Sequence, residues 1–334
     1  MKIDIVYTWV NGSDPKWKNK RIEKAKLIGK VLEDSTNEAL FMDNQELKYS
    51  LRSLDQFVPW INNIFIVTDN QIPDWINLEN PKVRIVDHTE IFLDKSNLST
   101  FSSQVIESQI HHIKDLSEFF IYFNDDMFIG NYCTPEYFYT KEGLPRIYVS
   151  EIIPIPNKKS LDITKRAPNK RNTYQHTVVN TRKLIMERFG KAVYYNIRHT
   201  IKPLLKSILF DLERIFEKEL NQTIKNSFRT NDDILLIYLF EFYLIAQKLG
   251  KTQYLITSDV NISALDLFSH LYKKFTFGFI NLHEKDIEEH LERLKKAKPF
   301  TFCLNQTPET PDEHLVKVKQ FLEEYFPKKS QFEK

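Results

Sequence analysis

The feature that most constrains the fold is an unbroken apolar run at residues 119–123 that ends abruptly in Asn124, Asp125 and Asp126. Aromatic and β-branched residues without polar alternation predict a strand buried on both faces of a sheet. Open α/β sheets bind their ligands at the carboxyl ends of such strands, where two carboxylates could hold a metal ion against a diphosphate. An Asp-rich segment after a strand is also a common turn, so the run alone leaves both interpretations open.

Strand and helix patterns alternate along the first part of the chain. Apolar runs at residues 3–10, 64–68 and 83–86 predict strands. Leucines or isoleucines recur at helical spacing in residues 44–57 and 102–113, which predicts two helices that each bury one face. The alternation indicates an α/β fold.

The helix predicted at residues 102–113 carries Glu107 and His111 one turn apart, on a different face from its isoleucines. The two side chains could approach a ligand together, or they could form an ordinary solvated pair. Either interpretation places both on the same surface of one helix.

The composition changes near residue 150. Pro154 and Pro156 precede a basic segment that could bind an anionic glycan or simply be solvated. We expect an α/β part at residues 1–150, and a mostly helical part at residues 151–334 that packs against it and completes the active site. Helical patterns in the second part are clearest at residues 202–221, 232–248 and 312–325.

Several classes of protein lack support in the sequence. The 47 lysines and arginines nearly balance the 45 acidic residues, so no global field indicates a nucleic-acid partner. The seven glycines form neither a GxGxxG pattern nor a Walker-type loop. Any phosphate group is therefore expected to be held by side chains and a metal ion.

The sequence also bears on location. Cys133 and Cys303 lack metal-ligand spacing and indicate free thiols in a reducing compartment. The amino terminus has no secretory signal pattern, and the apolar stretch at residues 234–246 is too short and contains Glu241, which favours a buried helix over a membrane span. We expect a cytoplasmic protein, with peripheral contact at the inner membrane face as an option.

Residues 7–15, Tyr-Thr-Trp-Val-Asn-Gly-Ser-Asp-Pro, begin as a strand and break at Asn11 into a polar turn. These residues alone do not decide whether Asp14 only forms the turn or also belongs to a binding site. In a parallel sheet the carboxyl end of this first strand should lie beside the Asn124 end of the later one, so that the two acidic clusters face one pocket.

Long sequence blocks resemble the Stealth family of sugar-phosphate transferases, which includes bacterial capsule polymerases and an animal GlcNAc-1-phosphotransferase. The first block is IDIVYTWVNGSDP, and the second runs from ELKYSLRSL through PWINNIFIVTDNQIPDWI and TFSSQVIESQIHHI to FFIYFNDDMFIG. A third includes His176 in YQHTVVNTRKL and Arg229 in NSFRTNDDILLIYLFEFYL, and a fourth begins at FCLNQTPETPDEHL. In the fourth block Gln306 replaces an acidic residue that is common in the family.

The resemblance implies a GT-A-like nucleotide-sugar-binding sheet and a transfer of hexose-1-phosphate. The donor would be UDP-GlcNAc or another UDP-hexose, and the acceptor a glycan hydroxyl, with a lipid-linked glycan as an option. The products would be a phosphodiester and a nucleoside monophosphate, in the synthesis of a capsule or cell-surface polysaccharide.

The resemblance also implies roles for individual residues. Mg²⁺ or Mn²⁺ would be bound by Asp125, Asp126 and Asn305, because these ions prefer oxygen ligands. The acceptor's proton would go to His176, assisted by Asp14, and Arg229 would clamp a phosphate group. The expected donor-binding residues are Asn11, Arg52, Asn70 and Asn124.

Two other functions remain open on the sequence. A metal-dependent GT-A glycosyltransferase would use the same donor and the same acidic residues but release a nucleoside diphosphate. A noncatalytic carbohydrate-binding protein would keep the fold without turnover.

Overall fold

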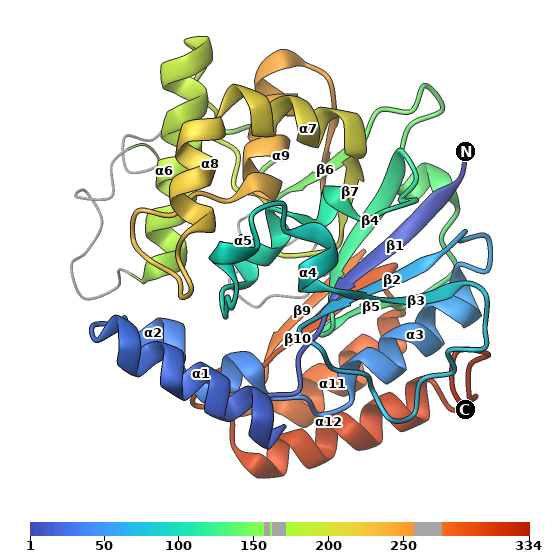
Figure 1. Ribbon diagram of the computed structural model, residues 1–334. Coiled ribbons are helices and arrows are strands. Elements are labelled where there is room, and N and C mark those ends of the chain that lie inside the picture. Colours follow the sequence, from blue (N-terminus) through green and yellow to red (C-terminus); the bar gives the residue numbers. More distant parts are fainter. Residues whose placement is uncertain (157–160, 162–171, 257–275) are drawn as a thin grey trace.

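The computed structural model describes residues 1–156, 161, 172–256 and 276–334. The basic segment after Pro156 lies almost entirely outside these residues, so its predicted contact with a glycan stays a prediction. The main sheet has five strands in the order β3-β2-β1-β4-β7, and all but β7 run parallel (Figure 1). These strands are β1 (Ile3–Thr8), β2 (Ile64–Thr68), β3 (Val83–Asp87), β4 (Phe119–Asn124) and β7 (Lys202–Leu205).

A turn at Asp125 and Asp126 joins the main sheet to a second one. It connects β4 to β5 (Met127–Ile129), which pairs with β10 (Thr301–Asn305), and β10 pairs in turn with β9 (Phe277–Asn281). A third, two-stranded sheet contains β6 (Arg146–Val149) and β8 (Lys251–Tyr254). The acidic turn therefore lies where the first two sheets meet.

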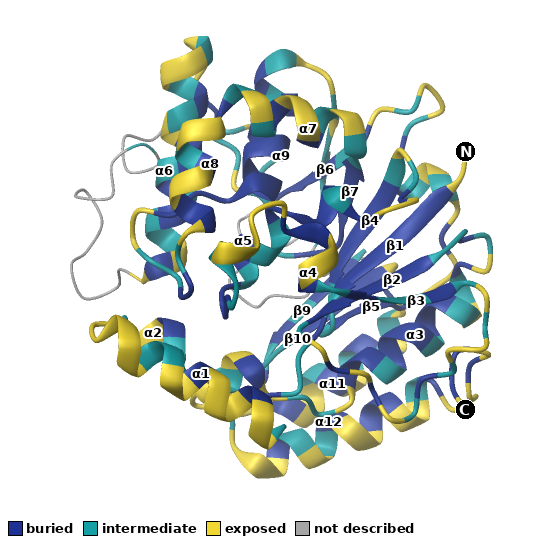
Figure 2. Ribbon diagram, in the orientation of Figure 1, coloured by how far each residue is buried: buried dark blue, intermediate teal, exposed yellow. Residues whose placement is uncertain are grey.

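The main sheet is buried on both faces, as the apolar runs predict. Ile5 and Tyr7 of β1 share a hydrophobic core with Leu51 of helix α3 (Glu46–Phe57), whereas Val6 belongs to the core that contains Phe240 of helix α9 (Leu236–Gln247). Figure 2 shows the strands as buried and the outer faces of α1 and α12 as exposed. Alternate side chains of one strand thus pack against helices on opposite sides of the sheet.

The helices form a layer on each side of the sheets (Figure 1). On one side lie α3 (Glu46–Phe57), α11 (Ile287–Ala297) and α12 (Asp312–Tyr325). The other side has α4 (His88–Ile91), α5 (Ser103–Glu107), α6 (Thr173–Phe189), α7 (Lys206–Ile215), α8 (Glu217–Ile224) and α9 (Leu236–Gln247). The remaining elements are α1 (Pro15–Ile28), α2 (Glu33–Thr36) and the 3-10 turns η1 (Glu38–Phe41), η2 (Lys95–Asn97), η3 (Ile110–His112) and η4 (Pro135–Tyr137).

These elements confirm the predicted α/β class, but two predicted helices are wrong in part. The helix expected at residues 102–113 is interrupted between α5 and η3, where the Ser108 hydroxyl donates to the carbonyl of Val105 at 2.6 Å and competes with helical hydrogen bonding. Residues 202–205 form edge strand β7 instead of a helix. Pro203 is tolerated in an edge strand and disfavours a helix interior.

The two expected parts, residues 1–150 and 151–334, share their sheets. Strands β7, β8 and β10 of the second part pair with β4, β6 and β5 of the first. The second part is mostly helical among its described residues, yet its strands are built into the sheets of the first. Both parts therefore supply walls to one site.

The acidic residue within the apolar helix α9 has a partner. The two carboxylate oxygens of Glu241 lie 3.2 and 3.1 Å from Nζ of Lys202 on β7, and both side chains are buried. The ion pair explains how a charged group fits inside this core. Across the described ranges, no helix combines the length and apolar character needed to cross a membrane.

Candidate functional site

A cavity of about 280 Å³ opens at the carboxyl ends of the central strands. Thr8 ends β1 and stands opposite Asn124 at the end of β4, and Asn305 ends β10. All three residues line the cavity. The parallel pairing of β1 with β4 therefore confirms that these two strand ends lie side by side.

Three carboxyl groups meet in one wall of this cavity: Asp125 and Asp126 from the turn after β4, and Glu46 from the start of α3. Burial raises the pKa of Asp125 well above its usual range, and the neighbouring charges of Glu46 and Asp126 raise it further. Burial raises the pKa of Glu46 to about 7 and that of Asp126 to about 6. The site without a cation therefore disfavours the charged forms of these carboxyl groups, and a bound cation would favour them again.

Asp126 has the environment of a cation ligand. Its Oδ2 accepts a hydrogen bond from the Cys303 thiol at 3.3 Å, and its buried Oδ1 has no hydrogen-bond partner in the described parts of the chain. One ligand atom each from Asp126, Cys303 and His199 lies within 4.8 Å of the others. An unsatisfied buried oxygen among mutually repelling carboxylates fits a divalent cation.

His199 precedes β7 and lines the same cavity. Burial lowers the pKa of its imidazole to about 4, and the positive charges of Lys202 and Arg229 lower it further. The ring is therefore neutral at pH 7 and has a lone pair available for a proton or a metal ion.

Asn305 and Gln306 form the part of the wall that follows β10. The Asn305 amide donates to Oδ1 of Asn281 at 2.9 Å, and Gln306 Oε1 accepts from Asn44 Nδ2 at 2.8 Å. Asn44 also donates to both oxygens of Glu46, each at 2.7 Å. Asn44 thus links the segment after β10 to the acidic wall.

Arg229 supplies positive charge to the cavity. Its Nη2 donates to the Ser103 hydroxyl at 2.8 Å. Burial lowers the pKa of Arg229, and the charge of Glu107 is the strongest of the influences that raise it. Burial raises the pKa of Glu107 to about 7 although Arg229 opposes this. Glu107 accepts from the Tyr122 hydroxyl at 3.3 Å, so the arginine is held beside the central strands by an oriented polar network.

The predicted pair Glu107 and His111 does not share a helix face. Glu107 ends α5 beside Tyr122, whereas His111 lies in η3 and contacts Glu213 of α7. The break between α5 and η3 turns the two side chains toward different neighbours. A shared role of the pair at one ligand is thereby ruled out.

Other residues that line the cavity combine aromatic and polar groups. Trp17 of α1 lies 5.2 Å, between ring centroids, from both Phe41 and Phe101. Beside them, Asp69 accepts from Lys20 at 2.8 and 2.7 Å. Burial lowers the pKa of the His88 imidazole to about 4. Such a wall offers an apolar surface to a flat ligand group and polar atoms at its edge.

Asn11, Asp14 and Asn70 lie in turns near the cavity without lining it. Asp14 caps α1, accepting from the amide of Lys16 at 2.9 Å, and also accepts from Gln71 Nε2 at 3.2 Å. The Gln71 amide also bonds the backbone of Asn11, and Asn70 is exposed. Their expected roles in catalysis and donor binding stay predictions.

Arg52 lies on α3 outside the cavity lining. Its guanidinium donates to both carboxylate oxygens of Glu333 at 2.8 and 2.9 Å and to the carbonyl of Phe326 at 3.0 Å. It therefore anchors the last described residues to α3. Donor binding by Arg52 stays a prediction, and its contacts with Glu333 and Phe326 give it a structural role.

His176 lies half-buried in the first turns of α6 and is not among the described residues that line the cavity. His199 and Glu46 do line it and were not anticipated. The sequence signal for Glu46 is its place at the start of the leucine-rich helix. His199 could be identified as a site residue only after β7 was known to be a strand beside β4.

Comparison with protein families gives three matching regions. They are Stealth protein conserved region 1 at residues 1–23, conserved region 2 at residues 40–147 and conserved region 3 at residues 198–246. Asp125, Asp126, His199 and Arg229 fall inside these regions, whereas His176 falls outside all three. The third region thus begins later than the block that includes His176.

Curated relatives match nearly the whole chain. The exopolysaccharide phosphotransferase SCO2594 of Streptomyces coelicolor is 35% identical over 99% of this chain and 51% of its own length. The exopolysaccharide phosphotransferase CpsY of Mycobacterium leprae is 33% identical over 99% of this chain and 57% of its own length. The chain spans about half the length of the curated relatives it matches.

Among solved structures, the chain is similar to the galactosyltransferase LgtC in complex with donor and acceptor sugar analogues. The TM-score is 0.41 at 11% sequence identity, and the alignment covers 97% of this chain and 95% of that one.

Proposed function

We propose that this chain, which belongs to the Stealth family, transfers a hexose-1-phosphate from a nucleotide sugar to a glycan hydroxyl in polysaccharide synthesis. Its relatives named exopolysaccharide phosphotransferases support sugar-phosphate transfer in general terms. The hexose, a UDP-linked donor such as UDP-GlcNAc and a lipid-linked acceptor are the finer parts of the proposal.

The observation that carries the proposal is that acidic side chains and a guanidinium line the same cavity. Asp125, Asp126 and Glu46 crowd one wall, and Arg229 lies in the same cavity. A diphosphate needs both a cation bound by carboxylates and a guanidinium that contacts its oxygens. An aromatic wall formed by Trp17 and Phe41 offers a surface for the base or the sugar.

Asp125 and Asp126 would hold the cation, with Asn305 beside them. When bound, Mg²⁺ or Mn²⁺ would neutralise the diphosphate and stabilise the leaving nucleotide. The unpaired Oδ1 of Asp126 is the chain's own evidence for this ligand. Glu46 would orient Asn44, which donates to both of its carboxylate oxygens.

Arg229 would orient the transferred phosphoryl group. Its hydrogen bond to Ser103 and the nearby charge of Glu107 fix the guanidinium before the donor arrives, so little ordering is needed on binding. The remaining N–H groups can donate to phosphate oxygens, and a guanidinium donates them in pairs.

His199 would accept the proton of the attacking hydroxyl. The ring lies within 4.8 Å of Asp126, is neutral at pH 7, and its low pKa would rise when a negative diphosphate binds nearby. The sequence-based candidate for this role is His176, and the two histidines can be separated by experiment.

The test is turnover of a panel of nucleotide sugars with a glycan acceptor, with EDTA-treated protein and added Mg²⁺ or Mn²⁺. We expect metal-dependent donor consumption that falls about 100-fold or more in Asp126→Asn and in His199→Ala. The matched control is His290→Ala, which removes a half-buried histidine that pairs with Glu284 and is not among the residues that line the cavity.

Full activity of Asp126→Asn in EDTA would contradict the metal-binding role. If His176→Ala loses activity while His199→Ala keeps it, His176 is the base. If every donor stays intact with folded protein and metal, the proposed transfer fails, and the noncatalytic carbohydrate-binding alternative is the one left to test.

A further inference from the structure

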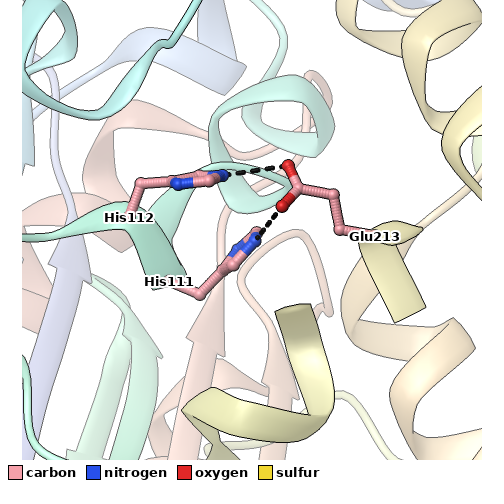
Figure 3. A group of neighbouring side chains, drawn as sticks. All are labelled: His111, His112 and Glu213. Carbon is pink, nitrogen blue, oxygen red and sulfur yellow. Dashed lines mark hydrogen bonds and ion pairs between the residues drawn. The ribbon is translucent and has the colours of Figure 1, made fainter. Parts of the chain in front are cut away.

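Two adjacent histidines converge on one carboxylate, away from the catalytic cavity. The Nε2 atom of His111 lies 3.1 Å from one carboxylate oxygen of Glu213, and that of His112 lies 2.9 Å from the other. Figure 3 shows both imidazoles, from η3, directed at the Glu213 side chain of α7. One ligand atom from each residue lies within 4.8 Å of the others.

We propose that His111, His112 and Glu213 bind a Zn²⁺ ion at a second site of this protein. Two imidazole nitrogens and a carboxylate oxygen are a ligand set that Zn²⁺ takes readily, with ligand distances of about 2.0–2.2 Å. Mg²⁺ and Ca²⁺ prefer oxygen ligands and would bind here poorly. Three protein ligands leave one coordination position for water.

The protonation states of the ligands suit a cation. Burial lowers the pKa of His111, so its ring is neutral near pH 7. The hydrogen bonds from the two histidines hold the pKa of Glu213 down to about 2, which keeps it ionised. To bind Zn²⁺ through Nε2, each neutral imidazole would carry its proton on Nδ1 instead, and the ionised carboxylate would supply an oxygen ligand without losing a proton.

The arrangement is held in place before an ion binds. The ring of Phe210 lies edge-on to both imidazoles, with centroids 4.7 and 5.1 Å away. The His111 side chain is fully buried, whereas Glu213 keeps 24% of its surface exposed. An ion can therefore approach from the Glu213 side and find two fixed nitrogens behind it.

One feature limits the affinity. Nδ1 of His111 is buried and has no hydrogen-bond partner in the described segments. In metal sites the second ring nitrogen usually donates to an acceptor, and losing such a partner costs about 10–100-fold in affinity. The site should therefore bind Zn²⁺ reversibly, and its occupancy would tie η3 to α7.

The alternative is a hydrogen-bonded clamp that binds no metal, and one comparison separates the two. EDTA-treated protein, Glu213→Gln and His112→Ala would each be titrated with ZnCl₂ while bound metal and the melting temperature are measured. Glu284→Gln is the matched control, because it alters a contact between one glutamate and one histidine, His290. The cavity residues are unchanged in all four proteins, so an ion bound there contributes equally.

We expect Glu213→Gln and His112→Ala to bind one Zn²⁺ fewer per chain, or to bind it at least about 10-fold more weakly. They should also lose a Zn²⁺-dependent rise in melting temperature that Glu284→Gln retains. Crystals soaked in ZnCl₂ should give an anomalous peak between the three side chains. Equal zinc content and equal zinc affinity in wild type and Glu213→Gln, or no peak at this position, would overturn the proposal. Circular dichroism shows whether each variant is folded, and the soaked wild-type crystal decides if one is not.

Discussion

Replacement of the buried carboxylate in the apolar helix α9 should destabilise the whole fold. In wild type the Nζ of Lys202 lies 3.1–3.2 Å from the Glu241 oxygens and donates to the carbonyl of Arg198 at 2.8 Å. Their side chains are only 6% and 4% exposed. In Glu241→Gln the ammonium keeps neutral acceptors but loses its counter-charge. Breaking a buried pair in this way costs about 3–5 kcal/mol of unfolding free energy.

The pH dependence of the lost unfolding free energy shows whether the unpaired charge of Lys202 causes the loss. Burial lowers the pKa of Lys202, and Glu241 is the group that raises it most, so the variant lowers this pKa further. A lysine whose native pKa lies below its unfolded value of about 10.4 destabilises the fold most at low pH. The cost disappears as pH rises toward that unfolded value. The deficit of the variant should therefore be smaller at pH 9.5 than at pH 7.5.

Urea denaturation followed by circular dichroism measures both quantities. A double variant, Lys202→Met with Glu241→Leu, removes both charges and should be less destabilised than Glu241→Gln alone. A loss below about 1 kcal/mol in Glu241→Gln, or a deficit that is equal at both pH values, would refute the reasoning that an uncompensated charge is responsible.

Three further predictions concern the walls and supports of the cavity. Arg52→Ala should lower the unfolding free energy by about 3 kcal/mol through loss of its contacts with Glu333, with an unchanged KM for the donor; a raised KM would support donor binding. Gly12→Ala should cost about 1–3 kcal/mol in thermal or urea denaturation, because a Cβ would meet the Phe41 carbonyl, and a variant as stable as wild type would contradict this contact. In EDTA-treated protein, Glu46 has a native pKa of about 7, above its unfolded value, so its contribution to stability is present below about pH 4.3 and is lost as pH rises toward 7. The melting temperature should therefore fall over this pH range, and Glu46→Gln should flatten the fall. An unchanged pH profile in the variant would contradict the raised pKa.

Much of the fold was predictable because buried strands and amphipathic helices leave strong patterns. The runs that became β1 and β4 were placed correctly, and their carboxyl ends meet at Thr8 and Asn124. The break at Ser108 and the strand containing Pro203 were missed, since each depends on local hydrogen bonding or pairing that apolar spacing does not encode.

The candidate site was predictable where residues end a strand or follow it directly. Asp125, Asp126 and Asn305 meet in the cavity for this reason, together with Arg229. The position of His199 near Asp126 was not predicted from the sequence, because it depends on the antiparallel pairing of β7 with β4.

Three other predicted site residues have structural contacts that the sequence pattern did not reveal, and their predicted roles are untested. Asn11 and Asp14 follow a strand end, but their polar groups serve the turn and the cap of α1. Arg52 has the chemistry of a phosphate ligand, yet its carboxylate partner, Glu333, is far away in the sequence and becomes a neighbour only in the folded chain.

The most direct test of the proposed transfer is the identity of its products. Wild-type protein would be incubated with the nucleotide sugar it consumes, Mg²⁺ or Mn²⁺ and a glycan acceptor, and the released nucleotide and the ³¹P spectrum of the glycan would be measured. Attack at phosphorus predicts a nucleoside monophosphate, a phosphodiester resonance and an unchanged anomeric configuration of the sugar. Release of a nucleoside diphosphate with a phosphorus-free glycosidic product would contradict the account.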